Sequence, residues 1–305
     1  MSDSARTGLK HVLARRFNYE ARNAGLFILP VMSVLAVVAV FPILYSLYTS
    51  LFRLKLTRPH RVPFVWLDNY AEVLTDELFL ESVWRTTSFT VMSVTVISVL
   101  ALLIALLLNE TFRGRRFVST MVLVPWAIPT VANGLLWKWI YDSGYGALNG
   151  LLYQLGIIDN YITWLGDPDK TIPLIANAFV WKEVPLAAIL ILVTMKSIPA
   201  DLYGAAKVDG ANMVQRFVHI TLPSLKPGFM LVMIYETMMA IRHFDLFFLL
   251  TEGGPANASH VVSWQIYVET FRNLSFGTGS AMSYILAIIT FALAYSIIKS
   301  LARKI

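Results

Sequence analysis

The chain has 305 residues, of which 57% are hydrophobic and only 14% are charged, whereas soluble domains carry about 25% charged residues. This composition favours a membrane protein, and the lack of cysteine excludes disulfides, thiolate metal sites and cysteine nucleophiles. The net charge of +6 comes from basic residues that lie mostly beside apolar runs, where orientation in a membrane explains them better than nucleic-acid binding does.

Six apolar segments are long enough to cross a bilayer, which takes about 20 mostly apolar residues. The first follows a basic tail, but it is too long for the core of a signal peptide and no cleavage pattern follows it, so we interpret it as a retained span. We therefore expect an all-α membrane protein with transmembrane helices near residues 25–51, 83–109, 117–141, 172–195, 227–250 and 280–301.

The charges predict the orientation, because Lys and Arg are enriched on the cytoplasmic side of a membrane. Six spans with the N-terminus inside place both termini in the cytoplasm. The basic residues on that side are then Arg6, Lys10, Arg15, Arg16, Arg22, Arg113, Arg115, Arg116, Lys196, Lys207, Arg216, Lys226, Lys299, Arg303 and Lys304. The outer side receives the acids Asp68, Glu72, Asp76, Glu77, Glu81, Asp142, Asp159, Asp167 and Asp169.

The predicted spans divide the chain into a cytoplasmic tail (1–23), a first transmembrane helix (24–52), a periplasmic loop (53–81), a transmembrane domain of five helices (82–298) and a cytoplasmic tail (299–305). One basic group fits this orientation badly, because Arg53, Lys55, Arg58 and Arg61 follow the first span on the predicted outer side. Snorkelling to lipid headgroups is the one explanation that the sequence offers for them.

Two of the outer loops are long. Residues 141–171 are rich in Gly, Asn, Tyr and Asp, and residues 251–279 contain the turn signal Gly253-Gly254-Pro255. Either loop could dock an external partner or simply connect two helices.

The cytoplasmic loop between the fourth and fifth spans has the most specific pattern. Pro199 ends one helix, a short helix follows through Ala205 and Ala206, and Asp209-Gly210 forms a turn. A second short helix runs from about residue 212 to 220, and Leu222-Pro223 is expected to stop it. The pattern predicts two short helices on the cytoplasmic surface.

This loop resembles the signature of the membrane subunits of type I ABC importers, which reads E-A-A, then D-G-A, then I-x-L-P. The matching residues are Ala205-Ala206, Asp209-Gly210-Ala211 and Ile220-Thr221-Leu222-Pro223, with Tyr203 and Gly204 just before them. The resemblance implies that the loop fits into a cleft of a separate ATPase subunit, which binds the ATP and Mg, so that this chain itself needs no cofactor. Gly204 stands where the family has Glu, so one acidic contact to the ATPase is missing.

Further segments resemble the carbohydrate branch of these permeases. They are residues 123–129 and 249–255, Trp137-Lys138-Trp139 and Phe244-Asp245. The resemblance implies the first of two sugar permeases in a cell inner membrane. Its expected partners are a second permease subunit, an ATPase dimer and a periplasmic or lipid-anchored substrate-binding protein.

Charged residues within a span are costly and are candidates for a function. On the fifth span Glu236, Ala240 and His243 share one helical face, and the resemblance implies that this face lines the sugar path together with Glu183 and Leu186. Carboxylate and imidazole groups can bond hydroxyls, and Trp181 or Tyr235 can stack on a sugar ring. Alternatively, the charged residues Lys182, Glu183, Arg242 and Asp245 form structural ion pairs or lie near the membrane interface, and His243 is a packing residue.

The sequence lacks the features that two other classes of protein would show. An ion-gradient-driven secondary transporter would favour internal inverted repeats, and no convincing repeat is found. An intramembrane enzyme would need a catalytic constellation, whereas the chain has no phosphate-binding G-x-x-x-x-G-K-[ST] motif, no H-E-x-x-H and no metal spacing among its five histidines. The sequence does not identify which sugar is carried.

Overall fold

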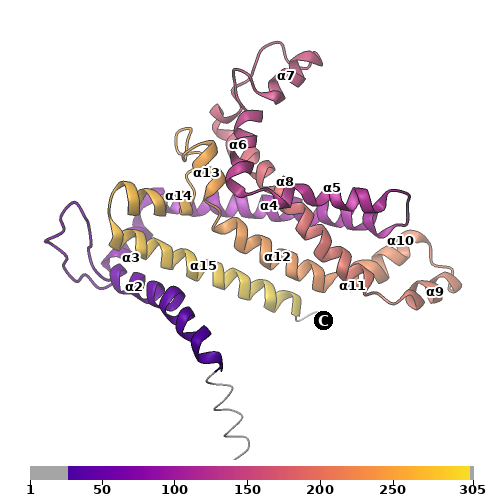
Figure 1. Ribbon diagram of the computed structural model, residues 1–305, viewed down its shortest axis with the longest axis horizontal. Coiled ribbons are helices and arrows are strands. Elements are labelled where there is room, and N and C mark those ends of the chain that lie inside the picture. Colours follow the sequence, from indigo (N-terminus) through magenta and orange to yellow (C-terminus); the bar gives the residue numbers. More distant parts are fainter. Residues whose placement is uncertain (1–26, 303–305) are drawn as a thin grey trace, which may run out of the picture.

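The computed structural model describes residues 27–302, with side chains up to residue 299 (Figure 1). Within these residues the secondary structure is helical, apart from two isolated bridges that join Phe52 to Phe64 and Lys55 to Ser275. The predicted basic tail residues Arg6, Lys10, Arg15, Arg16 and Arg22, and likewise Arg303 and Lys304, lie outside the described residues.

Four helices are long and apolar enough to cross a membrane without a break. They are the first helix Phe27–Ser50, which ends in α2 (Phe41–Ser50), then α4 (Glu77–Asn109), α8 (Pro168–Lys196) and α15 (Phe276–Ala302). At about 1.5 Å per residue, the 33 residues of α4 extend beyond the roughly 30 Å of hydrocarbon. The ends of this helix therefore project into the aqueous layers.

The third predicted span is not a single straight helix. It consists of α5 (Arg115–Ala127) and α6 (Thr130–Ile140), whose axes differ by 94°. Pro129 explains the break, because the residue before a proline is driven out of the helical region and Ile128 has an extended backbone with ψ of 129°. Hydropathy alone could not separate a bent pair from a straight span.

The fifth predicted span is broken as well. Helix α12 (Lys226–Ile241) ends before Arg242, and a separate short helix α13 (Asp245–Leu250) follows. At its other end α12 is preceded by a helical stretch, Met213–Ser224, that meets it at 56°. Counting each bent pair as one span gives up to six spans, by length and composition.

The prediction that Leu222-Pro223 stops the second short helix is wrong. Helix α10 (Met213–Arg216) passes through the π-helical turn η3 (Phe217–Thr221) into α11 (Leu222–Ser224), and the direction changes only at Leu225. Pro223 directly follows the π-helical turn η3, where the backbone already departs from the α-helical hydrogen-bond pattern that a proline would interrupt.

Helix α8 forms the centre of the packing, between α4, α5 and α12. Small residues on α4 and α8 are fully buried and let the two backbones approach closely; they include Ala101, Ala105, Ala178, Ala187 and Ala188. Phe89 of α4 then packs on Phe179 of α8 with ring centroids 5.4 Å apart. This pair of helices is the rigid element on which the remaining helices are assembled.

The segment after the first helix, which the charge pattern predicts to lie on the outer side, forms a compact layer with α3 (Asp68–Thr75). The buried amide of Asn69 donates to the carbonyls of Ser50 and Phe52, and Arg53 forms an ion pair with Glu72. Gly277 lies so close to the carbonyl of Phe52 that a Cβ atom would clash with it. At least Arg53, whose position the sequence left poorly explained, therefore has a carboxylate partner within the layer.

A second outer element stands away from the other helices. It contains the short helix α7 (Ala147–Gln154) and the turn η2 (Trp164–Gly166), and we call residues 141–166, which the charge pattern predicts to lie on the outer side, the outer arm (Figure 1). Its fold depends on the buried side chain of Asn149. The Nδ2 atom donates to the carbonyls of Asp142 and Ile162, while Oδ1 accepts from the Ile162 amide and the Trp164 indole.

Replacing Asn149 by Ala should loosen the outer arm alone. The substitution leaves buried backbone groups and the Trp164 indole without partners, which costs about 1–3 kcal/mol for each unsatisfied group. Hydrogen exchange should become faster across residues 141–166 and stay unchanged in α4 and α8. The matched control is Asn160→Ala, an exposed position on the same arm; equal protection in both variants would contradict the assignment.

Candidate functional site

The loop between α8 and α12 projects from one end of the long helices. It holds α9 (Ala200–Val208) and α10, joined by a tight turn at Asp209 and Gly210 (Figure 1). Gly210 has a φ of +80°, a conformation that glycine adopts without strain. The two short helices predicted from the sequence are thus present, and we call residues 200–221 the coupling loop.

Hydrogen bonds make the coupling loop one rigid unit. Asn212 and Gln215 form a reciprocal capping box at the start of α10. The Tyr203 hydroxyl lies 2.9 Å from the Thr221 hydroxyl, which ties α9 to the far end of the loop. The Ala211 amide donates to the carbonyl of Ala206 at 2.8 Å and closes the turn.

The surface of the coupling loop is unusually apolar for an exposed element. Val208, Met213 and Val214 are 88%, 77% and 69% exposed. Beside them lies a hollow of about 350 Å³ whose lining includes Ala206, Asp209, Gly210, Ala211, His219 and Ile220. Exposed apolar groups around a small hollow are typical of a protein-protein contact.

The other coupling-loop residues predicted from the sequence lie on the surface. Gly204 and Ala205 are exposed on α9, and a Cβ atom at Gly204 would meet no heavy atom within 4 Å. Leu222 and Pro223 are exposed on α11, just beyond the loop. Position 204 therefore has room for the larger side chain that the family signature carries there.

The predicted pathway face of α12 is buried inside the chain. Glu236, Ala240 and His243 have relative exposures of 0%, 1% and 9%. His243 lies just past the end of α12, and its ring packs 4.9 Å from that of Phe179 and 6.4 Å from that of Phe89. The structure thus brings these three residues together at the packing interface with α4 and α8.

Polar groups without hydrogen-bond partners gather at this interface. Within the described residues, both carboxylate oxygens of Glu236, Oε2 of Glu183 and Nε2 of His243 lack a partner. Lys182 Nζ lies 3.2 Å from Oε1 of Glu183, so the expected ion pair forms there. Since buried polar groups are nearly always paired, this cluster has capacity for hydroxyl groups of a ligand.

The other predicted pathway residues are half-buried, so they border a more open side of α8 and α12. Trp181 packs edge-on against Trp137 with ring centroids 5.9 Å apart, while Leu186 and Tyr235 are also partly exposed. Arg242 donates to the sulfur of Met239, and no ion pair joins it to Asp245 in the described chain. The proposed ion pairing therefore holds for Lys182 and Glu183 but not for Arg242 and Asp245.

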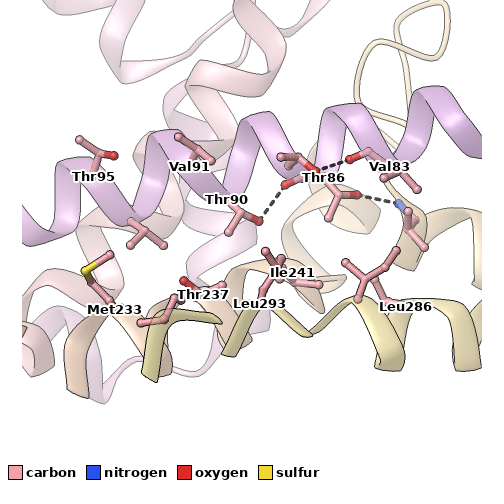
Figure 2. Close-up of a pocket in the computed structure, with 15 residues that line it drawn as sticks. Val83, Thr86, Thr90, Val91, Thr95, Met233, Thr237, Ile241, Leu286 and Leu293 are labelled. Carbon is pink, nitrogen blue, oxygen red and sulfur yellow. Dashed lines mark hydrogen bonds between the residues drawn. The ribbon is translucent and has the colours of Figure 1, made fainter. Parts of the chain in front are cut away.

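A groove of about 260 Å³ lies on the other side of α12, between α4 and α15 (Figure 2). Threonines line it, but the hydroxyls of Thr87 and Thr90 donate to backbone carbonyls one turn earlier, and that of Thr86 also accepts from the Val262 amide. Their methyl groups and the surrounding Val, Leu and Ile make the surface apolar. The groove suits hydrocarbon better than a polyol.

The sequence reasoning missed this groove. Its signal was the spacing of Val83, Thr86, Thr87, Thr90, Val91 and Val94 on one face of α4. The sequence pattern does not show that the threonine hydroxyls bond to carbonyls of their own helix, so it counts these residues as polar.

Comparison with curated proteins finds relatives that cover nearly the whole chain. The trehalose/maltose transport system permease protein MalF of Thermococcus litoralis is 39% identical over 91% of this chain and 91% of its own length. The sulfoquinovosyl glycerol transport system permease protein SmoG of Agrobacterium fabrum is 34% identical over 89% of this chain and 86% of its own length. The trehalose transport system permease protein SugA of Mycobacterium tuberculosis is 33% identical over 92% of this chain and 89% of its own length.

Comparison with solved structures gives the same fold. A chain of a bacterial ABC transporter involved in the import of the acidic polysaccharide alginate superposes with a TM-score of 0.81, at 21% identity, covering 95% of this chain and 99% of that one. A chain from a bacterial alginate ABC transporter in complex with an alginate pentasaccharide-bound periplasmic protein superposes with a TM-score of 0.78 at 20% identity, covering 94% of each chain. The fold is that of a type I ABC importer permease.

Residues 97–304 match the family described as the inner membrane component of binding-protein-dependent transport systems. The match covers the coupling loop and the four spans that surround it. Together with the relatives above, it shows that the chain belongs to this family, the membrane-spanning permeases of ABC transporters.

Proposed function

We propose that this chain is a permease subunit of an ATP-driven importer for a carbohydrate or sugar derivative. The observation that carries the proposal is the rigid coupling loop, which exposes apolar side chains between two spans of an importer fold. The named substrates of the relatives, among them trehalose and maltose, support a sugar-like cargo.

The proposed assembly contains four kinds of component. A second permease completes the path, and a dimer of ATPase subunits holds ATP and Mg at the coupling loop. An external substrate-binding protein delivers the sugar; a structure of the alginate transporter that contains a pentasaccharide-bound periplasmic protein supports this role. The complex lies in the cell inner membrane with both termini of this chain in the cytoplasm, in line with the distribution of basic residues.

The coupling mechanism follows from the stiffness of the loop. When ATP closes the ATPase dimer, a loop held by Tyr203–Thr221 and by the capping box moves as one body. Helix α8 ends just before the loop and α12 begins just after it, so both helices transmit this motion into the membrane. The two permeases then alternate between inward-facing and outward-facing states, which is a rigid-body form of switching.

The sugar path lies along α8 and α12 in this proposal. Glu183, Glu236 and His243 supply unpartnered polar atoms, and Trp181, Leu186, Tyr235 and Ala240 complete the surface. Because the polar atoms are buried in the isolated chain, access to them depends on a shift of α12 relative to α8. The division into tails, first helix, outer loop and five-helix domain remains a prediction of the sequence.

Reconstitution in liposomes tests the proposed function directly. With both permeases and the ATPase present, uptake of a radiolabelled disaccharide should require ATP and the added binding protein, because the energy enters through the ATPase. An ion gradient alone should give no uptake. Uptake by this chain alone under an ion gradient would instead identify a secondary transporter.

Substitutions at Gly204 test the role of the coupling loop. Gly204→Ala should stabilise α9 by about 0.5–1 kcal/mol, because glycine is a poor helix former, and the site has open space. Gly204→Glu adds the missing carboxylate as well. Co-purification with the ATPase should therefore survive a higher salt concentration for Gly204→Glu than for Gly204→Ala; equal salt resistance would argue against an acidic contact here.

Substitution of Glu236 tests the path. Glu236→Ala removes two unpartnered buried oxygens, so ATP-driven sugar uptake should fall at least tenfold, equivalent to about 1.4 kcal/mol, while the ATPase activity stimulated by the binding protein persists. Thr237→Val serves as the control, since Thr237 faces the apolar groove instead. Normal uptake by Glu236→Ala would remove Glu236 from the path.

A further inference from the structure

A polar cavity lies at the outer end of the helix assembly, opposite the coupling loop. Its volume is about 250 Å³, and its lining includes Glu72, Asp76, His260, Gln265, Glu269 and Asn273. These residues come from α3, the N-terminus of α4 and the segment that leads from α14 (Val262–Tyr267) into the turn η4 (Val268–Arg272) (Figure 1). We call it the outer acidic cavity.

The floor of the outer acidic cavity holds an acceptor without a donor. Gln265 is only 5% exposed, its Nε2 donates to Oδ2 of Asp76 at 3.0 Å, and its Oε1 has no hydrogen-bond partner in the described chain. A buried carbonyl oxygen without a donor is costly. A donor from outside this chain would satisfy it.

The charge of the outer acidic cavity favours a cationic donor. Glu72 is paired with Arg53, whereas among the described residues no basic side chain forms an ion pair with Asp76 or Glu269. Two nearby cations have acidic partners of their own, since Arg85 pairs with Glu81 and Arg272 pairs with Glu252, each at 2.7 Å, although Nη1 of Arg85 is buried without a hydrogen-bond partner. Asp76 and Glu269 therefore lie beside Gln265 without an ion-pair partner in the described chain.

His260 does not offset this negative charge. Burial and the neighbouring Arg85 lower the pKa of its imidazole, while Asp76 acts in the opposite direction. A histidine whose pKa is below its usual value is neutral at pH 7. Its Nδ1 lies 3.2 Å from the hydroxyl of Ser82, which holds the ring at the wall of the cavity.

The shape of the cavity indicates which cation fits. Within residues 27–302 no three acidic or histidine side chains come together closely enough to hold a metal ion. The acceptors are spread over the floor and walls, a pattern that suits a guanidinium or ammonium group on a flexible stem, since Arg carries five donors in a planar fork. The volume is below the 300–1,000 Å³ or so of sites for drug-sized ligands, and Glu72 and Asn273 at the mouth are exposed.

We propose that the outer acidic cavity receives a basic side chain of the external substrate-binding protein when that protein docks. This inference rests on the proposed function, because only a binding-protein-dependent importer has such a partner. The inserted cation bonds Oε1 of Gln265 and the carboxylates of Asp76 and Glu269. Because Asp76 caps the start of α4, whereas Gln265 and Glu269 lie in α14 and η4, docking bridges the start of a membrane-spanning helix and the segment that precedes α15.

The test uses the complete importer in lipid nanodiscs and measures the dissociation constant of its binding protein by biolayer interferometry. Asp76→Asn with Glu269→Gln removes both charges, yet Asn keeps an oxygen for the Phe79 amide and Gln keeps one for Asn273. We expect binding about tenfold weaker, equivalent to about 1.4 kcal/mol, with a smaller dependence on salt. The control pair is Asp68→Asn with Glu77→Gln, two outer acids that do not line the cavity.

The binding measurements distinguish a failure of the docking proposal from a failure of the proposed function. If the variant and control pairs bind equally well while wild type binds normally, the cavity is not the docking site, but the proposed function stands. If wild type does not bind the protein at all, the proposed function itself fails. Glu269→Gln alone serves if the double variant does not fold, because this half-buried side chain caps no helix; about threefold weaker binding is expected, and unchanged binding overturns the inference.

A free small cation is the competing source of the same chemistry. Ethylguanidinium should compete with docking of the binding protein to wild type and have no effect on the double variant. If calorimetry instead shows that ethylguanidinium binds the complete importer while docking stays unaffected by it, the site serves a small cation and the docking proposal is overturned.

Discussion

The close packing of α8 against α4 is the contact on which the rest of the structure depends. Buried alanines such as Ala105 and Ala187 let the two backbones approach, and the Phe89–Phe179 pair fills the space at one level. Helix α8 is also the element that joins the outer arm at one end to the coupling loop at the other. A continuous α8 therefore connects the outer arm directly with the coupling loop.

Polar groups in this apolar frame follow two different rules. On the groove side, threonine hydroxyls bond to their own helix, so the surface that remains is hydrocarbon. Between α8 and α12, Glu236 and one oxygen of Glu183 have no such internal partner. Because an unpaired buried polar group is costly, the second arrangement is the one that indicates function, and the same reasoning applies to Gln265 at the outer surface.

Prolines break some of the helices and are accommodated in others. Pro129 separates α5 from α6 by forcing Ile128 into an extended conformation, whereas Pro173 and Pro185 lie within a continuous α8. At Pro223 the helical stretch also continues, because the proline directly follows the π-helical turn η3. A proline in a sequence therefore marks a possible break, and the neighbouring helices decide whether the chain bends there.

The sequence by itself determined the membrane class, the positions of the long spans and the two-helix coupling loop, because hydropathy and turn residues act locally along the chain. It also identified the family through the spacing of Ala205, Asp209 and Leu222. Only the tertiary structure decided that Glu236 and His243 are buried against α4 and α8, that Arg53 pairs with Glu72, and that Asp76 and Gln265 share one cavity. Those relations join residues far apart in the chain, and they arise from helix packing that no local pattern encodes.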